Sequence, residues 1–451
     1  MRRLVSLCVL FAILVLGIAP ARAQFGTGTL PGEFMGMVIR DPHYEWNTNP
    51  DYPDDVNRAF YDSIGQNLAA AGVKWVRFEF WADEVENFNP DNPLEGLPLK
   101  ETDYFINVVA PRHDFKVLGL LASNLVRTDR WIHPEEIERT DQEMPQCWAY
   151  KYGCFTNEYM RLWLDRAFAI AERYENRVAA YEIMNEENRY ISPEHSGRGI
   201  SPQQMARLLT KFYRILKLNK GPEGTFGDWG KEVKIILGGL HPNRCQDCIN
   251  RGGTPMTDRE YLDAVYKSPS FAEFRNLPAS GGRWPLDGVG YHPYPMEMRY
   301  GLLPEPSGSS DLYRIPERVR DIRQVMVNNG DVQNKIWVTE IGDRGSPLDP
   351  DNMARQAQFM RSVYWMLWQQ REYVQTVLWF KYEDFEVETG AGNWGIVTLL
   401  PRTPTAECRE CQYEVNGAVQ RYKDSFFAYG EMAATGTGLE AYRTYLPIVT
   451  R

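Results

Sequence analysis

Two glutamates stand near the ends of short apolar segments that lie far apart in the sequence. Residues 181–186 read YEIMNE and end in Asn185 and Glu186, and residues 337–342 read WVTEIG and contain Glu340. Two carboxyl groups can break a glycosidic bond when one protonates the leaving oxygen and the other attacks the anomeric carbon, at a separation of about 5 to 5.5 Å. This chemistry requires a fold that brings together two side chains 154 residues apart.

Eight short apolar runs predict such a fold. They occupy residues 34–39, 73–80, 116–122, 178–184, 233–240, 286–291, 336–341 and 373–380. Each run is followed by a segment that can form a helix, at residues 56–71, 103–113, 157–173, 202–218, 258–274, 316–328, 352–370 and 420–433. Eight alternating units predict the α/β class and a (β/α)8 TIM barrel. A doubly wound open sheet is the alternative, but the glycine-rich phosphate turn usual in that fold is absent here.

The barrel places Glu186 and Glu340 at the ends of its fourth and seventh strands. In such barrels the carboxyl ends of the strands and the loops that follow them form the active face. The segments after the strands are long, notably residues 123–156, 292–315 and 381–419. We therefore expect both glutamates at one mouth, with long loops on the catalytic face forming the walls of a cleft.

The amino terminus reads as an export signal. Two arginines precede an apolar run over residues 4–19, and the sequence ARA that follows is a small-x-small cleavage site. An uncleaved membrane anchor is the alternative, since about 20 apolar residues span a bilayer. We expect a signal peptide at residues 1–23, one catalytic domain at residues 24–433 and a C-terminal tail at residues 434–451. The mature protein is then secreted and extracellular.

Cysteine count and charge agree with export. The six cysteines that follow the leader fall in loops after strands and predict three local disulfides, Cys147 with Cys154, Cys245 with Cys248, and Cys408 with Cys411. The two Cys-x-x-Cys pairs have an alternative, a shared zinc site. The formal charge of -10 becomes -13 without the three arginines of the leader, which argues against nucleic acid or an anionic membrane as partner.

The fourth run resembles the fourth-strand motif of glycoside hydrolase clan A, Trp-Glu-x-Trp-Asn-Glu-Pro. Tyr181, Glu182, Met184, Asn185, Glu186 and Glu187 stand at the matching positions. The resemblance, which leans toward family thirty-nine or family five, implies a retaining β-glycosidase. It assigns Glu186 as general acid/base, Asn185 as partner of the substrate 2-hydroxyl and Glu340 as nucleophile. Glu187 departs from the usual proline. Because consecutive side chains diverge, only one of the two glutamates is expected to face the cleft.

Three further positions match the clan. Arg77, in the second run, is implied to support the nucleophile, with a buried ion pair to Glu182 or Glu79 as the alternative. In the sixth run residues 291–294 read YHPY, which resembles the clan's His-x-Tyr. By that match Tyr294 contacts the nucleophile and His292 lies near the reacting sugar. The alternative for His292 is a satisfied core histidine.

Aromatic side chains supply the expected sugar platforms. Trp379, near the end of the eighth run, matches the platform under the sugar at the cleavage point, and its alternative is a place in the barrel core. Further platforms are expected on loops of the active face, at Trp81, Trp131, Trp148 and Trp394.

Two other function classes fit parts of the sequence. A metal-dependent barrel hydrolase could use His241, His292 and Glu186, but such enzymes usually carry His-x-His on the first strand, where this chain reads GMVIR. A non-catalytic carbohydrate-binding barrel would keep its aromatic residues and lose a catalytic carboxyl, yet both carboxyls are present. We therefore expect a monomeric enzyme acting on β-linked carbohydrate, with no cofactor and no metal.

Overall fold

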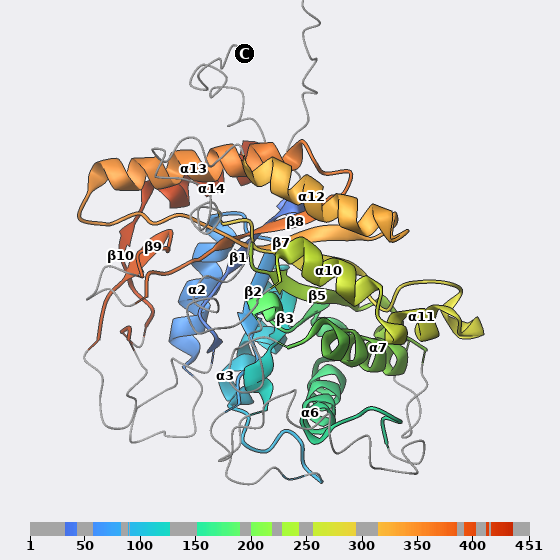
Figure 1. Ribbon diagram of the computed structural model, residues 1–451. Helices are drawn as coiled ribbons and strands as arrows, with labels where there is room; N and C mark the ends of the chain where they lie inside the picture. Colours follow the sequence, from blue (N-terminus) through green and yellow to red (C-terminus); the bar gives the residue numbers. More distant parts are fainter. Residues whose placement is uncertain are drawn as a thin grey trace, which may run out of the picture.

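Eight parallel strands close into a barrel in the order of the sequence (Figure 1). The computed structural model describes residues 32–42, 57–82, 89, 91–126, 151–189, 200–218, 228–242, 256–294, 314–385, 392–402, 412–414 and 416–435. The strands are β1 (Met35–Val38), β2 (Trp75–Glu79), β3 (Lys116–Leu121), β4 (Ala180–Ile183), β5 (Lys234–Leu240), β6 (Gly288–Tyr291), β7 (Lys335–Ile341) and β8 (Val374–Phe380). Pairing of β8 with β1 closes the sheet. The predicted (β/α)8 barrel is confirmed.

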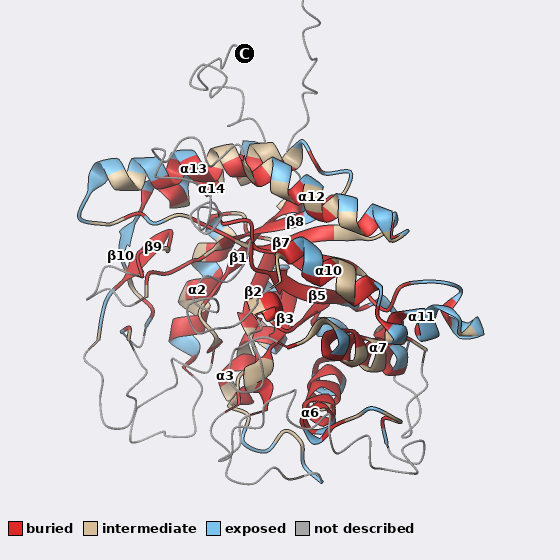
Figure 2. Cartoon of the chain, in the orientation of Figure 1, coloured by how far each residue is buried: buried red, intermediate tan, exposed pale blue. Residues whose placement is uncertain are grey.

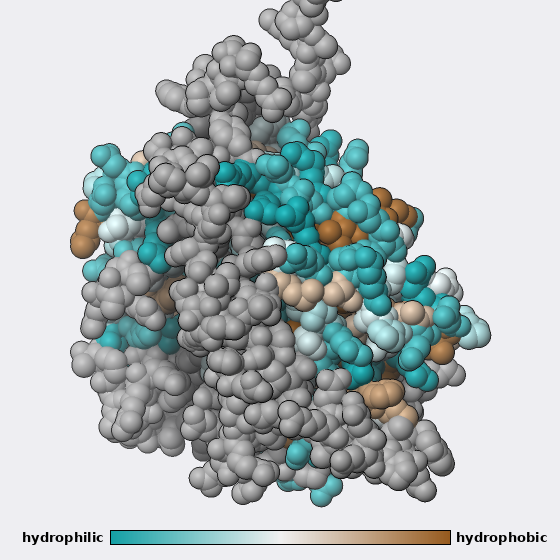
Figure 3. Space-filling view, viewed as in Figure 1, coloured by the Kyte–Doolittle hydropathy of each residue, from teal (hydrophilic) through white to brown (hydrophobic). Residues whose placement is uncertain are grey.

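Helices follow the strands and cover the outside of the barrel (Figure 1). The longer ones are α2 (Arg58–Ala70), α6 (Glu158–Tyr174), α7 (Pro202–Leu218), α10 (Asp258–Tyr266), α12 (Arg314–Asn328), α13 (Pro350–Trp368) and α14 (Asp424–Thr435). After β2 the helix is composite, with α3 (Leu99–Tyr104), a π-helical turn and α4 (Ala110–Arg112) in succession. Their inner faces are buried, and much of the outer face over α12 and α13 is hydrophilic (Figures 2 and 3). This amphipathic pattern is typical of helices that pack on the outside of a barrel.

The core has two layers because successive strand residues point to opposite faces of the sheet. The larger layer lies between strands and helices. The smaller layer fills the barrel and contains Val38, Trp75, Leu118, Ala180, Ile236, Trp337 and Leu378. Within it the rings of Trp75 and Trp337 meet edge to face, with centroids 5.2 Å apart. Two residues further along β2 and β4, on the same inner face, stand Arg77 and Glu182. The interior of the barrel is thus apolar in its lower layer, toward the amino ends of the strands, and charged at the mouth formed by their carboxyl ends.

Two predicted helices have different bounds in the structure. The helix expected over residues 258–274 is divided into α10 and α11 (Pro269–Arg275), because Ser268 caps a new helix with Pro269 at its start. The helix expected over residues 420–433 begins only at Asp424. The residues before it form β10 (Val419–Tyr422), which pairs antiparallel with β9 (Val397–Leu399). This small sheet depends on pairing between distant segments, so local periodicity did not predict it.

Several sequence predictions lie outside the described residues. They concern residues 1–23, most of the C-terminal tail, Trp131, Trp148, and five of the six loop cysteines. The sixth, Cys154, is disulfide-bonded, but its partner is not among the described residues, so the pairing stays a prediction. Of the helices in the described ranges, none is long and apolar enough to cross a membrane.

Candidate active site

Arg77 organises the mouth of the barrel. Its Nε donates to Glu182 Oε2 at 2.5 Å, and its Nη1 donates to Glu340 Oε1 at 2.7 Å. Its Nη2 donates to Asn185 Oδ1 at 2.9 Å. Burial alone would lower the pKa of Arg77, but the two carboxylates outweigh burial and raise it above its ordinary value. The arginine is therefore a fixed cation, and the two roles weighed for it, support of Glu340 and an ion pair with Glu182, occur together.

Glu182 is the buried anchor of this cluster. Its Oε1 accepts from the backbone N–H of Gly239 at 2.8 Å and from the hydroxyl of Thr339 at 2.7 Å. Its Oε2 accepts from Arg77. The side chain is fully buried and borders no part of the cavity, so it positions its neighbours and has no access to a ligand. The sequence analysis named Glu182 as a possible buried partner of Arg77, but it did not predict the hydrogen bonds to Gly239 and Thr339.

Glu340 lies at the end of β7 with both oxygens engaged. Oε1 accepts from Arg77, and Oε2 accepts from the hydroxyl of Tyr294 at 3.0 Å. Donors on both oxygens suit an ionised carboxylate. The side chain remains 13% exposed and borders the cavity. Tyr294 and Arg77 thus lie against Glu340 where the resemblance expected them.

Glu186 follows β4 in a left-handed backbone conformation. Its φ is 54°, and Met184 two residues earlier has φ 67°. Such values cost free energy in residues other than glycine and often occur at functional sites. The backbone N–H of Glu186 donates to the carbonyl of Gly239 at 3.0 Å, which holds the turn. This turn aims the Glu186 carboxyl at the barrel mouth.

Two basic side chains hold the Glu186 carboxyl. Nδ1 of His292 lies 3.3 Å from Oε1, and Nη1 of Arg189 donates to Oε2 at 2.9 Å. Burial raises the pKa of Glu186, but the hydrogen bond with His292 and the charges of His241, His292 and Arg189 outweigh burial and hold the pKa well below its ordinary value. The pKa of His292 is raised, because Glu340 and Glu186 outweigh the opposing effect of burial. Arg189 was not identified from the sequence, where it is one of many loop arginines.

His292 links the two predicted catalytic carboxyls. Its Nδ1 lies 3.3 Å from Glu186 Oε1 and 3.8 Å from Glu340 Oε2. These two carboxyl oxygens are therefore no further apart than the sum of the distances, about 7.1 Å. Side chains separated by 154 residues of sequence thus meet at one point of the barrel mouth.

Glu187 occupies a different environment from Glu186. Its carboxyl is buried, and no hydrogen-bond partner for either oxygen exists in the described part of the chain. Burial, followed by the charges of Glu182 and Glu186, raises the pKa of Glu187 well above its ordinary value. Among the described side chains, no group of three His, Cys, Asp or Glu residues is placed to hold a metal.

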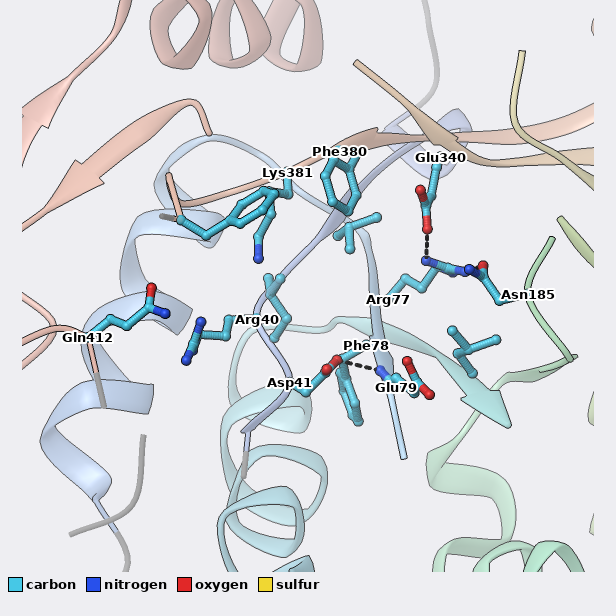
Figure 4. A pocket seen from close by; sticks show the side chains of 14 residues that line it. Arg40, Asp41, Arg77, Phe78, Glu79, Asn185, Glu340, Phe380, Lys381 and Gln412 are labelled. Atoms are coloured by element: carbon cyan, nitrogen blue, oxygen red, sulfur yellow. Dashed lines mark hydrogen bonds and ion pairs between the residues drawn. The ribbon is translucent and has the colours of Figure 1, made fainter. Parts of the chain in front are cut away.

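The expected position of Trp379 in the cleft is wrong. Its side chain is fully buried on the outer face of β8 and packs against Phe359 of α13, with ring centroids 5.9 Å apart. Phe380, the next residue, points into the cavity (Figure 4). Because strand residues alternate between faces, an error of one position in a continuous apolar run reverses the face. The ring centroid of Trp394 lies 6.0 Å from that of Phe380, but neither Trp394 nor Trp81 is among the residues that line this cavity.

A cavity of about 480 Å³ opens beside Glu340. Arg77, Asn185 and Glu340 form one side of it (Figure 4). Its other walls come from the ends of β1, β2 and β8 and from a distant segment, with Arg40, Asp41, Glu79, Phe380, Lys381, Phe385 and Gln412 among the lining residues. Of the charged residues in this second group the sequence analysis named only Glu79, as a possible ion-pair partner of Arg77, since a single charged residue after a strand is a weak signal.

No family model and no curated protein sequence matches this chain. Solved structures do match it. A glucosidase from Croceicoccus marinus aligns with a TM-score of 0.51 and 13% identity, over 91% of this chain and 69% of its own. A family 39 glycoside hydrolase from Bacteroides cellulosilyticus aligns with a TM-score of 0.47 and 16% identity. The alignment covers 90% of this chain and 65% of that structure, so the chain spans less than two thirds of it. A GH5-4 broad specificity endoglucanase from Clostridium acetobutylicum aligns with a TM-score of 0.48 and 12% identity, over 89% of this chain and 97% of its own.

These likenesses concern the fold. The chain shares its closed barrel with the solved structure of the Croceicoccus marinus glucosidase. What the site does has to be argued from its own residues.

Proposed function

We propose that this protein is a secreted retaining β-glycosidase that cleaves β-linked oligo- or polysaccharides, with Glu340 as nucleophile and Glu186 as general acid/base. One observation carries the proposal: both carboxyls lie within 4 Å of the same nitrogen of His292. Their separation of at most about 7.1 Å includes the range of about 5 to 5.5 Å that double displacement requires. Secretion rests on the signal peptide expected at residues 1–23.

Glu340 suits the attacking group. The hydrogen bonds from Arg77 and Tyr294 stabilise its negative charge and fix its orientation. In the first step an oxygen of Glu340 bonds to the anomeric carbon while the bond to the leaving oxygen breaks and Glu186 gives that oxygen a proton. In the second step a water attacks the same carbon, Glu186 takes the proton of that water, and the bond to Glu340 breaks.

The proton that Glu186 must give is defined by the hydrogen bonds around His292. The hydroxyl of Thr339 donates to Glu182, so its oxygen is left to accept from Nε2 of His292, 3.0 Å away. Nδ1 of a neutral His292 is then an acceptor, and among the described side chains the one within hydrogen-bond distance that can donate to it is a protonated Glu186. The pair therefore holds one proton, either as imidazolium with carboxylate or as imidazole with carboxylic acid.

Substrate binding favours the second form of this pair. The charges of His292 and Arg189 hold Glu186 ionised, whereas burial acts in the opposite direction. A sugar that covers Glu186 removes the remaining water, which increases the cost of separated charges. The proton then moves from His292 to Glu186, which becomes the acid at the moment the leaving oxygen is in place.

Replacing each carboxyl by a group that cannot react separates the two roles. With an activated aryl β-glycoside as substrate, Glu340→Gly and Glu186→Ala should both lose most activity. Added azide should restore turnover by attack in place of the missing group, giving the α-glycosyl azide in the Glu340 variant and the β-glycosyl azide in the Glu186 variant. NMR of the products distinguishes them. Identical products from the two variants, or wild-type rates in either, would contradict the roles.

A panel of sugars identifies the substrate class. The mature protein would be tested against β-glucan, mannan and xylan and against aryl β-glycosides of the common sugars. Absence of turnover on all of them, with retained binding of one, would support the non-catalytic alternative.

A further inference from the structure

The cavity beside Glu340 extends away from Glu186 toward charged residues that the proposed mechanism does not use. Arg40 and Asp41 follow β1, Glu79 ends β2, and Lys381 follows β8 (Figure 4). Because Glu186 and His292 are not among the lining residues, the cavity lies on the nucleophile side of the site. A sugar bound there with its anomeric carbon at Glu340 would turn its remaining hydroxyls toward Asp41.

Asp41 offers an acceptor to that sugar. Its Oδ1 accepts from the backbone N–H of Glu79 at 2.6 Å, which fixes the carboxyl in orientation. Neither a hydrogen bond nor an ion pair to Oδ2 is present in the described part of the chain, and Oδ2 is not sealed from the cavity. Burial raises the pKa of Asp41 to about 6, against the backbone bond from Glu79 and the charges of Lys381, Arg40 and Arg77. The Asp41 carboxyl is thus ionised at neutral pH, although its burial makes the charged form unfavourable.

The cations of the cavity are more fully engaged than Asp41. Arg77 uses its donors on Glu182, Glu340 and Asn185. The ammonium of Lys381 lies 2.8 Å from Glu383 Oε1, and Arg40 stands over the ring of Tyr413 at 5.7 Å. A carboxylate or sulfate on the sugar would have to compete with these partners, and it would be repelled by Asp41.

We infer that Asp41 is a specificity-determining residue that binds a free hydroxyl of an uncharged sugar on the nucleophile side of the cleavage point. The inference rests on the proposed function and defines the substrate class of that site. A hydroxyl donates to Asp41 through a charge-assisted hydrogen bond, and its oxygen accepts from a neighbouring donor such as Lys381. Phe380 and Phe385 on the β8 side of the cavity offer apolar surface to the C–H groups of the same ring.

The test combines Asp41→Asn with sugars that lack single hydroxyls. A hydrogen bond to a charged group is worth roughly a 10- to 100-fold change in kcat/KM. In the wild type, one monodeoxy aryl glycoside should lose about that factor relative to its parent. In Asp41→Asn the parent should lose a similar factor, and the same deoxy sugar should then lose little more. If, for every deoxy sugar, the loss in kcat/KM from the missing hydroxyl multiplies the loss from Asp41→Asn, the inference is overturned. A wild-type preference for a uronic acid glycoside over its neutral counterpart would also overturn it.

Asp114→Asn is the matched control. Asp114 is a surface aspartate, 91% exposed and paired with Lys74. Its substitution removes the same charge and should leave kcat/KM unchanged for every sugar. If Asp41→Asn does not fold, Asp41→Ser gives a second variant of the same position.

A binding measurement separates failure of this inference from failure of the proposed function. In Glu340→Gln, where turnover is silenced, NMR titration with the free monosaccharide of the best substrate should show binding that Asp41→Asn weakens about 10-fold or more. Turnover without an effect of Asp41 on binding would overturn the inference alone. Binding that depends on Asp41, without turnover in the wild type, would overturn only the proposed hydrolysis.

Discussion

Two clusters of buried charge lie near the barrel mouth, and they differ in what they face. The first joins Arg77, Glu182 and Glu340, and Glu340 borders the cavity. The second joins Lys423 and Asp384, whose ion pair of 2.6 Å is fully buried. Each cluster fixes a carboxylate by a cation and several hydrogen bonds. Only the first leaves its carboxylate accessible to a ligand.

The second cluster is closed by its own neighbours. Asp384 accepts from Gly395 N at 2.9 Å and from the Thr398 hydroxyl at 2.7 Å, and Lys423 also donates to the carbonyl of Gly345 at 2.7 Å. Burial raises the pKa of Asp384 despite Lys423, and burial lowers the pKa of Lys423 despite Asp384. This pair ties the segment after β8 to the residue before α14. Strong charge pairing alone therefore does not mark a reactive site, whereas pairing beside a cavity does.

Glu340→Gln tests the first cluster and should have the largest effect. The amide cannot attack the anomeric carbon, so kcat/KM on an aryl β-glycoside should fall by at least about 1000-fold. Glu182 still neutralises Arg77, so the melting temperature should change little. Circular dichroism is the control for folding. Loss of activity together with loss of folding would place Glu340 with the structural cluster.

Lys423→Met tests the second cluster. It leaves Asp384 buried without its cation, and removal of one partner of a buried pair typically costs about 3 to 5 kcal/mol in the free energy of unfolding. Urea denaturation measures this change. The double variant Lys423→Met/Asp384→Leu should recover much of the loss, since it leaves no buried charge alone. A Lys423→Met protein as stable as the wild type would contradict the assigned role.

Arg189→Gln should shift the pH profile by a smaller amount. Arg189 helps to lower the pKa of Glu186, so its removal raises the affinity of the Glu186–His292 pair for its proton. The alkaline limb of kcat/KM should therefore move to higher pH by about one unit or less. An unchanged or downward shift would show that Arg189 does not act on the shared proton.

Asp41→Asn should have the smallest effect, on stability. The pKa of Asp41 is about 6 in the folded protein against an ordinary value of 3.8, so the folded state holds the proton more tightly than the unfolded chain. The wild type therefore loses stability as pH rises from about 4 to 6 and does not regain it above. At pH 7 the variant should melt a few degrees above the wild type, and the difference should vanish near pH 4. Scanning calorimetry at both values checks this.

Much of the fold and of the first cluster could be predicted from the sequence. The strands and their order follow from the apolar runs. The mouth residues Arg77, Glu186, His292, Tyr294 and Glu340 were predicted because their strand-end motifs resemble those of clan A. The β9–β10 sheet and the division between α10 and α11 could not, because one depends on pairing of distant segments and the other on a single cap within a helical pattern.

The missed site residues have a different explanation. Trp379 was assigned to the wrong face because β8 is apolar on both faces. The alternation of polar and apolar residues therefore does not show which side chains point into the barrel. Asp41, Lys381 and Arg189 each follow a strand, where isolated charges are common and only the three-dimensional arrangement shows which of them reach the site.

Gly239 limits how this site can change. Its backbone N–H donates to Glu182, and its carbonyl accepts from the backbone N–H of Glu186. A Cβ added at this position would lie 1.9 Å from Nε2 of His292. Even alanine at this position would displace the imidazole that holds the shared proton. A lineage that altered this residue would first have to replace the histidine, so a larger residue at position 239 is expected only where position 292 has already changed.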